Sequence, residues 1–428
     1  MKARGFAGPG PADLLVSCLA ARIEPSFSDL VAQASRRDWD NIVDVAVREH
    51  VAPLLFKRLK ESDSRAGIPA DAWKRLRRAY FTSGDRNTRL YRELRTVLEC
   101  LRSSGVKVIV LKGAYLAEAV YGDVALRPMC DADLLVPRAE LPRAQAILLD
   151  MGGAHLKQHN QAAPAPRAQH EDIEPGRRMK KHALPVFIRD LAIELHWTIV
   201  SPTELFSMDA AGLWDRARPA TTAGVEVLSL SPEDLLLHLC LHFCCEDGCK
   251  GLRYLCDIAE TVHHFRGKMD WLQVVDRARE WGAPRYAGLS LHLARTLLGA
   301  TVPEDALCRL VPRGLDSRLL KKATECVLVQ EGYDDWSLLP FPNRFGGKWT
   351  LERVKALRDV VFLPKDEMAS RYPRARDSRH LWPYYFLRSA DLLRYCGRAT
   401  LQPGFRMMRV HERNNTPSLA AWLKSGIR

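Results

Sequence analysis

The sequence predicts an α/β (α+β) protein with a small mixed-sheet core between an N-terminal and a C-terminal helical region. Two observations predict the core: residues 106–111 and 132–136 are mostly apolar segments of strand character, and a helical pattern follows each. A third observation predicts the two helical regions: apolar residues recur at helical spacing before the core, and residues typical of a helix start follow it. We expect helices over 1–101, the core over 102–229 and a helical domain over 230–428.

The N-terminal region has the spacing of an amphipathic helix. Positions i, i+3, i+4, i+7 and i+8 of one stretch are occupied by Trp39, Ile42, Val43, Ala46 and Val47. Residues at this spacing share one face of a helix. We therefore expect a small helical subdomain before the core.

Two strand–helix units begin the predicted core. Val106 to Leu111 is β-branched and mostly apolar, as a buried strand should be, and a helix from about Ala114 to Val120 follows. A second strand from about Ala132 to Val136 precedes a helix from Glu140 to Met151. This strand–helix–strand–helix order is typical of an α/β core.

The rest of the core contains an interruption. Glycines, prolines and many charges over residues 152–180 predict a flexible insertion. A further strand is expected from Leu191 to Ile199. Beyond residue 230 the chain turns helical, because Ser231 suits the N-cap and Pro232 the first helical position.

The composition indicates which kinds of partner the protein binds and in which cellular compartment it works. With 64 Lys and Arg against 51 Asp and Glu, the formal charge of +13 favours anionic partners such as nucleotides, nucleic acids or acidic membrane surfaces. Eleven cysteines, an odd number in a chain too long to need disulfide staples, indicate a reducing compartment. No uncharged stretch approaches the roughly 20 residues of a membrane span, and the N-terminus makes a poor signal peptide. We expect a soluble, cytoplasmic protein.

Three carboxylates stand on two of the predicted strands. Because side chains alternate along a strand, Asp131 and Asp133 project on the same side, about 7 Å apart. Glu194 and His196 share one face of the later strand, whose other face is apolar. Two such carboxylates repel unless a cation lies between them, and hard oxygen ligands suit Mg²⁺. An Asp-x-Asp pair alone is also typical of a solvated strand end.

Lys112 and Gly113 follow the first strand and open the predicted helix. A helix N-terminus presents free N–H groups and a partial positive charge, which attract an anion. Gly113 lets the backbone approach closely, and Lys112 adds a point charge. The turn therefore suits a phosphate, although a Lys-Gly pair alone is almost uninformative.

Three motifs are distinctive in combination: Val110–Ala114, Arg127–Val136 and Ile193–Trp197. They contain leucine-lysine-glycine, then an arginine shortly before an aspartate-x-aspartate strand, then glutamate-leucine-histidine-tryptophan. In this order they resemble the uncharacterised nucleotidyltransferase family of the polymerase-beta-like superfamily. The likeness covers most of the chain.

The resemblance implies an enzyme that depends on Mg²⁺ or Mn²⁺. It would move a nucleoside monophosphate from an NTP, expected to be ATP, to a hydroxyl of a small-molecule or protein acceptor. Pyrophosphate would leave. Nucleic acid remains a possible partner, and the acceptor, the preferred base and the oligomeric state are left open.

The resemblance also implies roles for individual residues. The catalytic and metal-binding residues would be Asp131, Asp133 and Glu194. The substrate-binding residues would be Lys112, Gly113, Arg127 and His196. The first three of these would contact the triphosphate, whereas His196 would either line the site or orient Glu194.

The sequence departs from the superfamily pattern at two places. Lys112-Gly113 stands where a glycine-serine motif is usual, and Cys130 where a small residue such as glycine is usual. Both concern the phosphate loop and leave the metal ligands intact.

The alternative function is a catalytically silent nucleotide- or nucleic-acid-binding regulatory module on the same fold. The three carboxylates favour the enzyme, because near an anionic ligand they need bridging metals.

Two other segments admit a functional interpretation. A single helix from Leu235 to Cys249 would carry a stripe of possible zinc ligands: His238, His242, Cys245 and Cys249. Such a helix spreads them over about 16 Å, so they cannot all reach one ion, and core packing is preferred. Residues 371–388 interleave arginines with aromatic residues, which suits nucleic-acid binding or an amphipathic helix with a basic face.

Overall fold

A computed structural model of the chain describes residues 11–20, 31, 34–62, 64–155, 183, 185–200, 206–246, 249–311, 315–328, 362, 378, 380–389 and 419–424. The chain forms two compact units. The first comprises Met1–Pro164, Lys181–Val329 and Leu423–Arg428, and it contains the sheet and the helices from α1 to α15. Among the helices that the structure describes, none has the length and apolar character needed to cross a bilayer.

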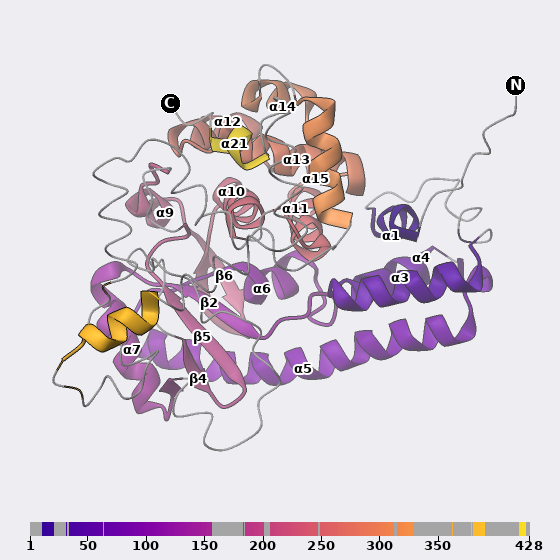
Figure 1. Ribbon diagram of the computed structural model, residues 1–428. Coiled ribbons are helices and arrows are strands. Elements are labelled where there is room, and N and C mark those ends of the chain that lie inside the picture. Colours follow the sequence, from indigo (N-terminus) through magenta and orange to yellow (C-terminus); the bar gives the residue numbers. More distant parts are fainter. Residues whose placement is uncertain are drawn as a thin grey trace, which may run out of the picture. The chain divides into compact units, whose positions relative to one another are not determined.

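The first unit is built around one seven-stranded mixed sheet (Figure 1). The strands lie in the order β3-β4-β5-β2-β1-β7-β6. Their bounds are β1 Ile109–Val110, β2 Asp131–Leu135, β3 Ala154–His155, β4 Val186–Ile188, β5 Leu191–His196, β6 Arg218–Thr222 and β7 Val225–Ser229. Helices flank the sheet, which confirms the predicted α/β (α+β) class.

Strand β2 lies at the centre of the sheet, parallel to β5 and antiparallel to β1. Its apolar side chains Ala132 and Leu134 are fully buried, as are Ile193 and Leu195 of β5. The residues between them therefore share the opposite face, as strand alternation requires. The first strand is shorter than predicted at both ends, and soon after it the chain turns into a helix at Lys112.

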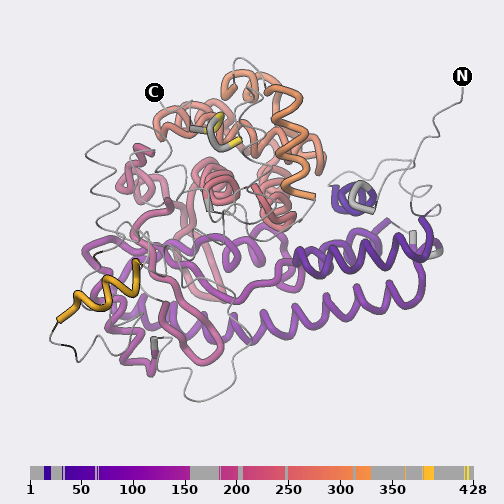
Figure 2. The backbone as a smooth tube through the Cα atoms, viewed as in Figure 1, coloured from indigo at the N-terminus to yellow at the C-terminus, as the bar shows by residue number. Residues whose placement is uncertain are grey.

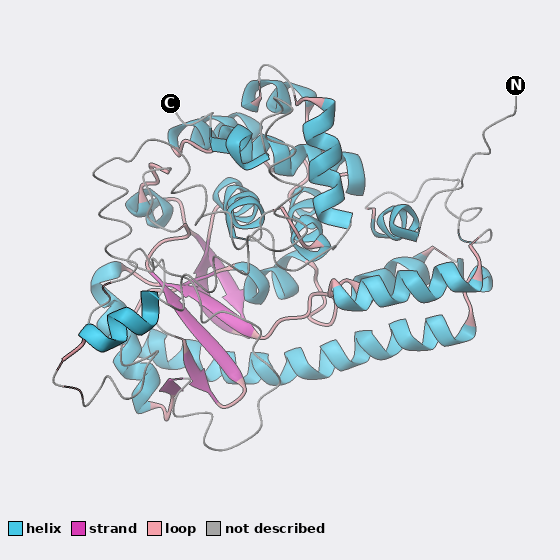
Figure 3. Ribbon diagram, viewed as in Figure 1, coloured by secondary structure: helices cyan, strands magenta, loops and turns pink. Residues whose placement is uncertain are grey.

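The N-terminal region supplies the helices α1 Pro11–Leu19, α3 Arg36–Arg48, α4 Ala52–Glu61 and α5 Ala70–Ser103. In α3 a capping box between Ser35 and Asp38 starts the helix. Four of the five predicted apolar residues of α3 are buried, but Val47 is 46% exposed and lies beside the buried face. The long helix α5 runs along the sheet and packs against β5, β7 and α7 (Figure 3).

Helices also connect the strands. After β1 the chain forms α6 Lys112–Tyr115 and a π-helical turn η2 Leu116–Val120, in place of the single helix expected there. After β2 comes α7 Leu141–Asp150, close to the predicted bounds. Of the predicted insertion over 152–180, residues 156–180 lie outside the described part of the chain, while Ala154–His155 forms strand β3.

Between Pro232 and Leu328 the described chain is mostly helical, as its course in Figure 2 shows. It contains α10 Pro232–Leu241, α11 Leu252–His264, α12 Trp271–Glu280, α13 Pro284–Leu298, α14 Glu304–Leu310 and α15 Ser317–Leu328. The Ser231 side chain accepts a hydrogen bond from the backbone of Asp234, which confirms the predicted N-cap of α10. A short helix α9 Ala210–Asp215 precedes β6.

The single helix predicted from Leu235 to Cys249 is wrong. Helix α10 ends at Leu241 and continues as a wider π-helical turn, η4 His242–Glu246. Cys249 then has a left-handed φ of 61° and donates its N–H to the carbonyl of Phe243, so the chain has left the helix axis there. Across the described residues, this stripe contributes no group of three convergent metal ligands.

Most of the basic, aromatic segment 371–388 lies outside the described residues. Its last part is helical over residues 382–389, where Trp382 is 71% and Phe386 is 76% exposed. The nucleic-acid interpretation of this segment stays a prediction.

Candidate active site

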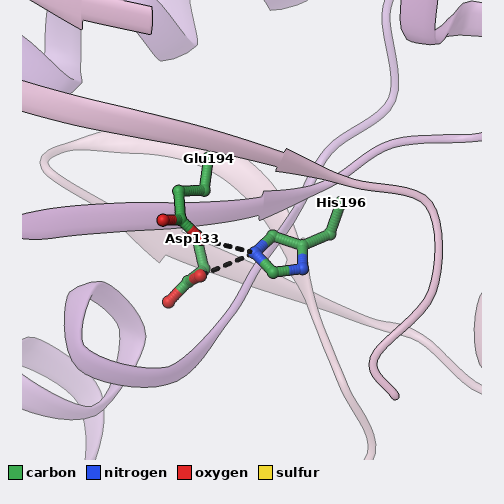
Figure 4. Close-up of side chains that lie close together, drawn as sticks. All are labelled: Asp133, Glu194 and His196. Atoms are coloured by element: carbon green, nitrogen blue, oxygen red, sulfur yellow. Dashed lines mark hydrogen bonds and ion pairs between the residues drawn. The ribbon is translucent and has the colours of Figure 1, made fainter. Parts of the chain in front are cut away.

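The pairing of β2 with β5 brings the predicted acidic residues together. In the parallel register Asp133 lies opposite Glu194, and Leu135 lies opposite His196. Figure 4 shows Asp133, Glu194 and His196 pointing toward one another from the two neighbouring strands. His196 Nε2 lies 2.6 Å from Asp133 Oδ1 and 3.4 Å from Glu194 Oε2. Residues from two distant segments therefore form one cluster.

The cluster is largely shielded from solvent. The side chain of His196 is 1% exposed and that of Asp133 is 7% exposed, whereas that of Glu194 is 21% exposed. Burial raises the pKa of Asp131, and the nearby charge of Asp133 raises it further, while Lys112 lowers it. Negative charges at this density favour a cation, and Glu194 is more open to an incoming group than Asp133.

Lys112 supplies a positive charge from the turn between β1 and α6. Its Nζ lies 3.2 Å from Asp133 Oδ1. The residue has a left-handed φ of 42°, which is uncommon outside glycine and costs backbone energy. The N–H of Leu111 donates to the carbonyl of Asp133, so the turn is also pinned to β2 by the sheet. The strained backbone places the ammonium group beside the acids.

Gly113 is required at this turn for a packing reason. A Cβ built on it would lie 2.6 Å from Nη1 of Arg127, a distance that real contacts do not allow. The guanidinium group of Arg127 therefore lies against the backbone of Gly113. Any larger residue would push the arginine away or move the turn.

Arg127 is buried and paired with the helical region. Its Nη2 donates to Oδ2 of Asp257 in α11 at 2.8 Å, and its Nε lies 3.2 Å from Oδ1 of the same carboxylate. Tyr121 also donates to Asp257, at 2.8 Å. Burial opposes the charge on Arg127, but Asp257 outweighs it and raises the pKa of the guanidinium above its ordinary value. The structure thus turns Arg127 toward α11.

A pocket opens beside Lys112, between the turn and the helical region. Its lining residues are Lys112, Arg127, Leu239, His242, Tyr254 and Asp257. The guanidinium of Arg253 stacks 4.7 Å above the Tyr254 ring, donates to the Tyr254 hydroxyl at 2.8 Å and reaches the carbonyl of Pro128 at 3.4 Å. Two positive side chains, Lys112 and Arg127, therefore line the pocket, and Arg253 contacts a third lining residue, Tyr254.

The donor set fits a divalent cation. One ligand atom each of Asp133, Glu194 and His196 lies within 4.8 Å of the others. Neighbouring ligands of an octahedral Mg²⁺ are about 3 Å apart, close to the 2.6 and 3.4 Å separations found here, so these three atoms could occupy part of such a shell after small adjustments. Carboxylates suit Mg²⁺ and Mn²⁺, while imidazole is a common ligand of transition metals. Asp131 lies on the same face of β2 but outside this convergent group, so its predicted role as a metal ligand stays a prediction.

Comparison with known proteins decides the family. The family profile described as uncharacterised nucleotidyltransferase matches residues 35–299, well over half of the 428-residue chain. The chain belongs to this nucleotidyltransferase family. The match includes all the site residues described above, from Lys112 to Asp257, and so covers both the sheet and the first helices of the helical region.

Other comparisons add little to the family assignment. No curated protein matches the chain. A solution structure of the antibiotic-resistance factor ANT(2'')-Ia is similar at 14% identity, covering 48% of this chain and 97% of that one. The TM-score is 0.32, a likeness too distant to support an argument about this nucleotidyltransferase.

Two residues of the nucleotidyltransferase site escaped prediction, and one of them left a signal. Asp257 sits on the buried face of α11 among apolar residues, and a buried carboxylate needs a partner. That pattern is visible in the sequence, although the identity of the partner is not. Arg253 gives no local signal, because its contacts with Tyr254 and the carbonyl of Pro128 depend on how α11 packs beside the sheet.

Proposed function

We propose that the chain is a divalent-metal-dependent nucleotidyltransferase that moves a nucleoside monophosphate from an NTP to a hydroxyl acceptor. The observation that carries the proposal is the convergence of Asp133, Glu194 and His196 within 4.8 Å, with Lys112 beside them. In a member of this family, buried acids and a lysine at the rim of one pocket suit a metal-bound polyphosphate.

The chemistry would proceed by in-line displacement. The acceptor oxygen bonds to the α-phosphorus, the bond from that phosphorus to the bridging oxygen breaks, and pyrophosphate leaves. The proton of the acceptor hydroxyl passes to a carboxylate, for which Glu194 is best placed because it is the most exposed acid of the convergent group. Mg²⁺ or Mn²⁺ bound by these acids would stabilise the charge on the attacking and leaving oxygens.

The chain's own cations would hold the phosphates. Lys112 lies between Asp133 and the pocket, so its ammonium group can exchange the carboxylate for a phosphate oxygen. Arg253 contacts Tyr254, which lines the same pocket, and its guanidinium group can offer charge-assisted hydrogen bonds to a phosphate. We propose that the β- and γ-phosphates lie between these two groups, and that ATP is the first NTP to test.

The test is incubation of the purified protein with each NTP and either Mg²⁺ or Mn²⁺, with pyrophosphate release and self-labelling as readouts. We expect release that requires both the NTP and the metal and increases when an acceptor is supplied. Binding of an NTP without release, across small-molecule and protein acceptors, would instead identify a catalytically silent binding module.

A further inference from the structure

A chain of contacts links helix α11 to the acidic cluster. Asp257 is 1% exposed and holds Arg127 through two guanidinium nitrogens, one of them at 2.8 Å. Arg127 in turn lies against Gly113, where no side chain fits. Gly113 follows Lys112, whose Nζ contacts Asp133. Asp257 thus holds Arg127 in place, Arg127 restricts the backbone at Gly113, and that backbone positions the Lys112 side chain.

The backbone at Lys112 needs such support. A lysine with a left-handed φ of 42° is strained, and strained residues persist only when their surroundings hold them. The sheet holds one side of the turn through the hydrogen bond from Leu111 to Asp133. On the other side the guanidinium group of Arg127 is the nearest group to Gly113, ahead of the side chain of Met129, and the Tyr91 hydroxyl donates to the carbonyl of Ala114.

Arg127 itself has limited freedom to bind a ligand. Nε and Nη2 face Asp257, and Nη1 lies 3.3 Å from the carbonyl of Pro128. Its side chain is 7% exposed. Separating a buried pair of this kind leaves an uncompensated charge, which is strongly unfavourable. The arginine is therefore better suited to support the turn than to leave Asp257 for a phosphate.

We propose that Asp257 is a positioning residue: it holds Arg127 beneath Gly113 and thereby keeps the Lys112 ammonium group at the edge of the metal site. The proposal rests on the proposed function for its effect on phosphate binding, but not for its effect on Lys112. It assigns to the helical region a part in forming the phosphate site, and it replaces direct phosphate contact as the role of Arg127.

The first measurement concerns Lys112 without any nucleotide. Reductive methylation followed by mass spectrometry gives the reactivity of Lys112 relative to Lys107, an exposed lysine on the same segment. In Asp257→Asn we expect Lys112 to become several times more reactive while Lys107 does not change. General loosening of the fold would instead raise the reactivity of many buried groups together.

The matched control is Asp234→Asn. Asp234 is also a fully buried aspartate of the helical region, paired with Arg277 at 3.1 Å and Arg216 at 2.8 Å, but it does not line the pocket. Both variants lose a buried charge pair, so both should melt at a lower temperature. Only Asp257→Asn should alter Lys112. Equal changes in the two variants would show that Asp257 is merely structural and overturn the proposal.

The second measurement is the affinity for inorganic pyrophosphate in the presence of Mg²⁺. We expect Asp257→Asn to weaken it about tenfold or more, the loss that follows when a charge-assisted contact is misplaced, and Asp234→Asn to leave it unchanged. If the Asp257 variant does not fold, Gly113→Ala tests the same link from the other side, because its Cβ displaces Arg127. Unchanged affinity and unchanged Lys112 reactivity in both would overturn the proposal.

The two proposals fail in different ways. A wild-type protein that binds no pyrophosphate and releases none from any NTP would contradict the proposed function, while the reactivity of Lys112 would still test Asp257. A wild-type protein that binds pyrophosphate, with an Asp257 variant that binds it equally well and keeps Lys112 protected, would contradict the positioning role alone.

Discussion

Asp133 and Glu194 face each other across two parallel strands, and a single imidazole nitrogen of His196 approaches a carboxylate oxygen of each. Three potential ligands are thus held by backbone pairing rather than by flexible loops. A site on rigid elements keeps its geometry without ligand, which favours catalysis by preorganised groups.

Removal of the Asp133 carboxylate should abolish transfer but not folding. We expect Asp133→Asn to reduce metal-dependent pyrophosphate release at least about 100-fold, because loss of even a supporting residue at a metal site costs up to that much. The protein should still fold, since the substitution keeps the shape and relief of repulsion with Asp131 offsets part of the lost ion pair with Lys112. The control is Asp190→Asn, an exposed acid in the turn before β5. Retained turnover in Asp133→Asn would remove the metal assignment.

His196 should contribute to the affinity for the metal ion rather than to the affinity for the nucleotide. Because its Nε2 lies within 3.4 Å of both acids, we expect His196→Asn to weaken Mn²⁺ binding about 10- to 100-fold. The free Mn²⁺ signal in electron paramagnetic resonance measures this affinity without turnover. His264→Asn, at the exposed end of α11, serves as the control. Equal Mn²⁺ affinity in both variants would mean that His196 only packs beside the cluster.

Arg253 should contribute to binding of the phosphates. We expect Arg253→Gln to raise KM for the NTP about tenfold, because one charge-assisted contact is lost, and to change kcat little. Affinity for the corresponding nucleoside monophosphate should not change. Arg266→Gln, beyond the far end of α11, is the control. An equal loss of affinity for monophosphate and triphosphate would place Arg253 away from the β- and γ-phosphates.

Glu49 should give stability a dependence on pH. Its buried carboxylate accepts the N–H of Leu252 at the start of α11, and burial raises its pKa above the ordinary value of 4.5 despite that hydrogen bond. The folded state therefore holds the proton more tightly than the unfolded state, and stability falls as pH rises from about 4.5 through the folded pKa. Glu49→Gln keeps an acceptor without the charge.

The expected result is a melting temperature of Glu49→Gln that exceeds the wild-type value at pH 7, with a difference that shrinks as the pH falls toward 4. Thermal unfolding across this range measures it. Glu226→Gln, whose side chain is 88% exposed in the wild type, should show no such trend. A difference independent of pH would show that Glu49 does not titrate as its burial indicates.

The acidic cluster could be predicted because strand alternation is a local rule. Asp131 and Asp133 are two residues apart on one strand, and Glu194 and His196 are two residues apart on another. Each pair therefore shares one face of its strand, which can be inferred before any tertiary structure is known. The fold class followed from equally local patterns of strand and helix. The pairing of β2 with β5 needed the family resemblance in addition, since alternation does not specify neighbours.

What could not be predicted depends on contacts between distant segments. The partner of Arg127 lies 130 residues further along the chain, and no spacing rule connects it to Asp257. The left-handed turn at Lys112 and the π-helical end of α10 are similar cases. Helix propensity alone favours an ordinary α-helix at both places, and tertiary packing overrides that preference.

The parallel register of β2 and β5 makes the chemistry depend on a single alignment. A slip of one residue would present Ile193 and Leu195 where Glu194 and His196 now stand, and would turn Glu194 and His196 toward the apolar core. A misaligned sheet therefore loses its ligands and its stability in the same event. A molecule with this one-residue slip should therefore be both inactive and unstable. We expect no stable but inactive population that arises from misalignment of β2 and β5.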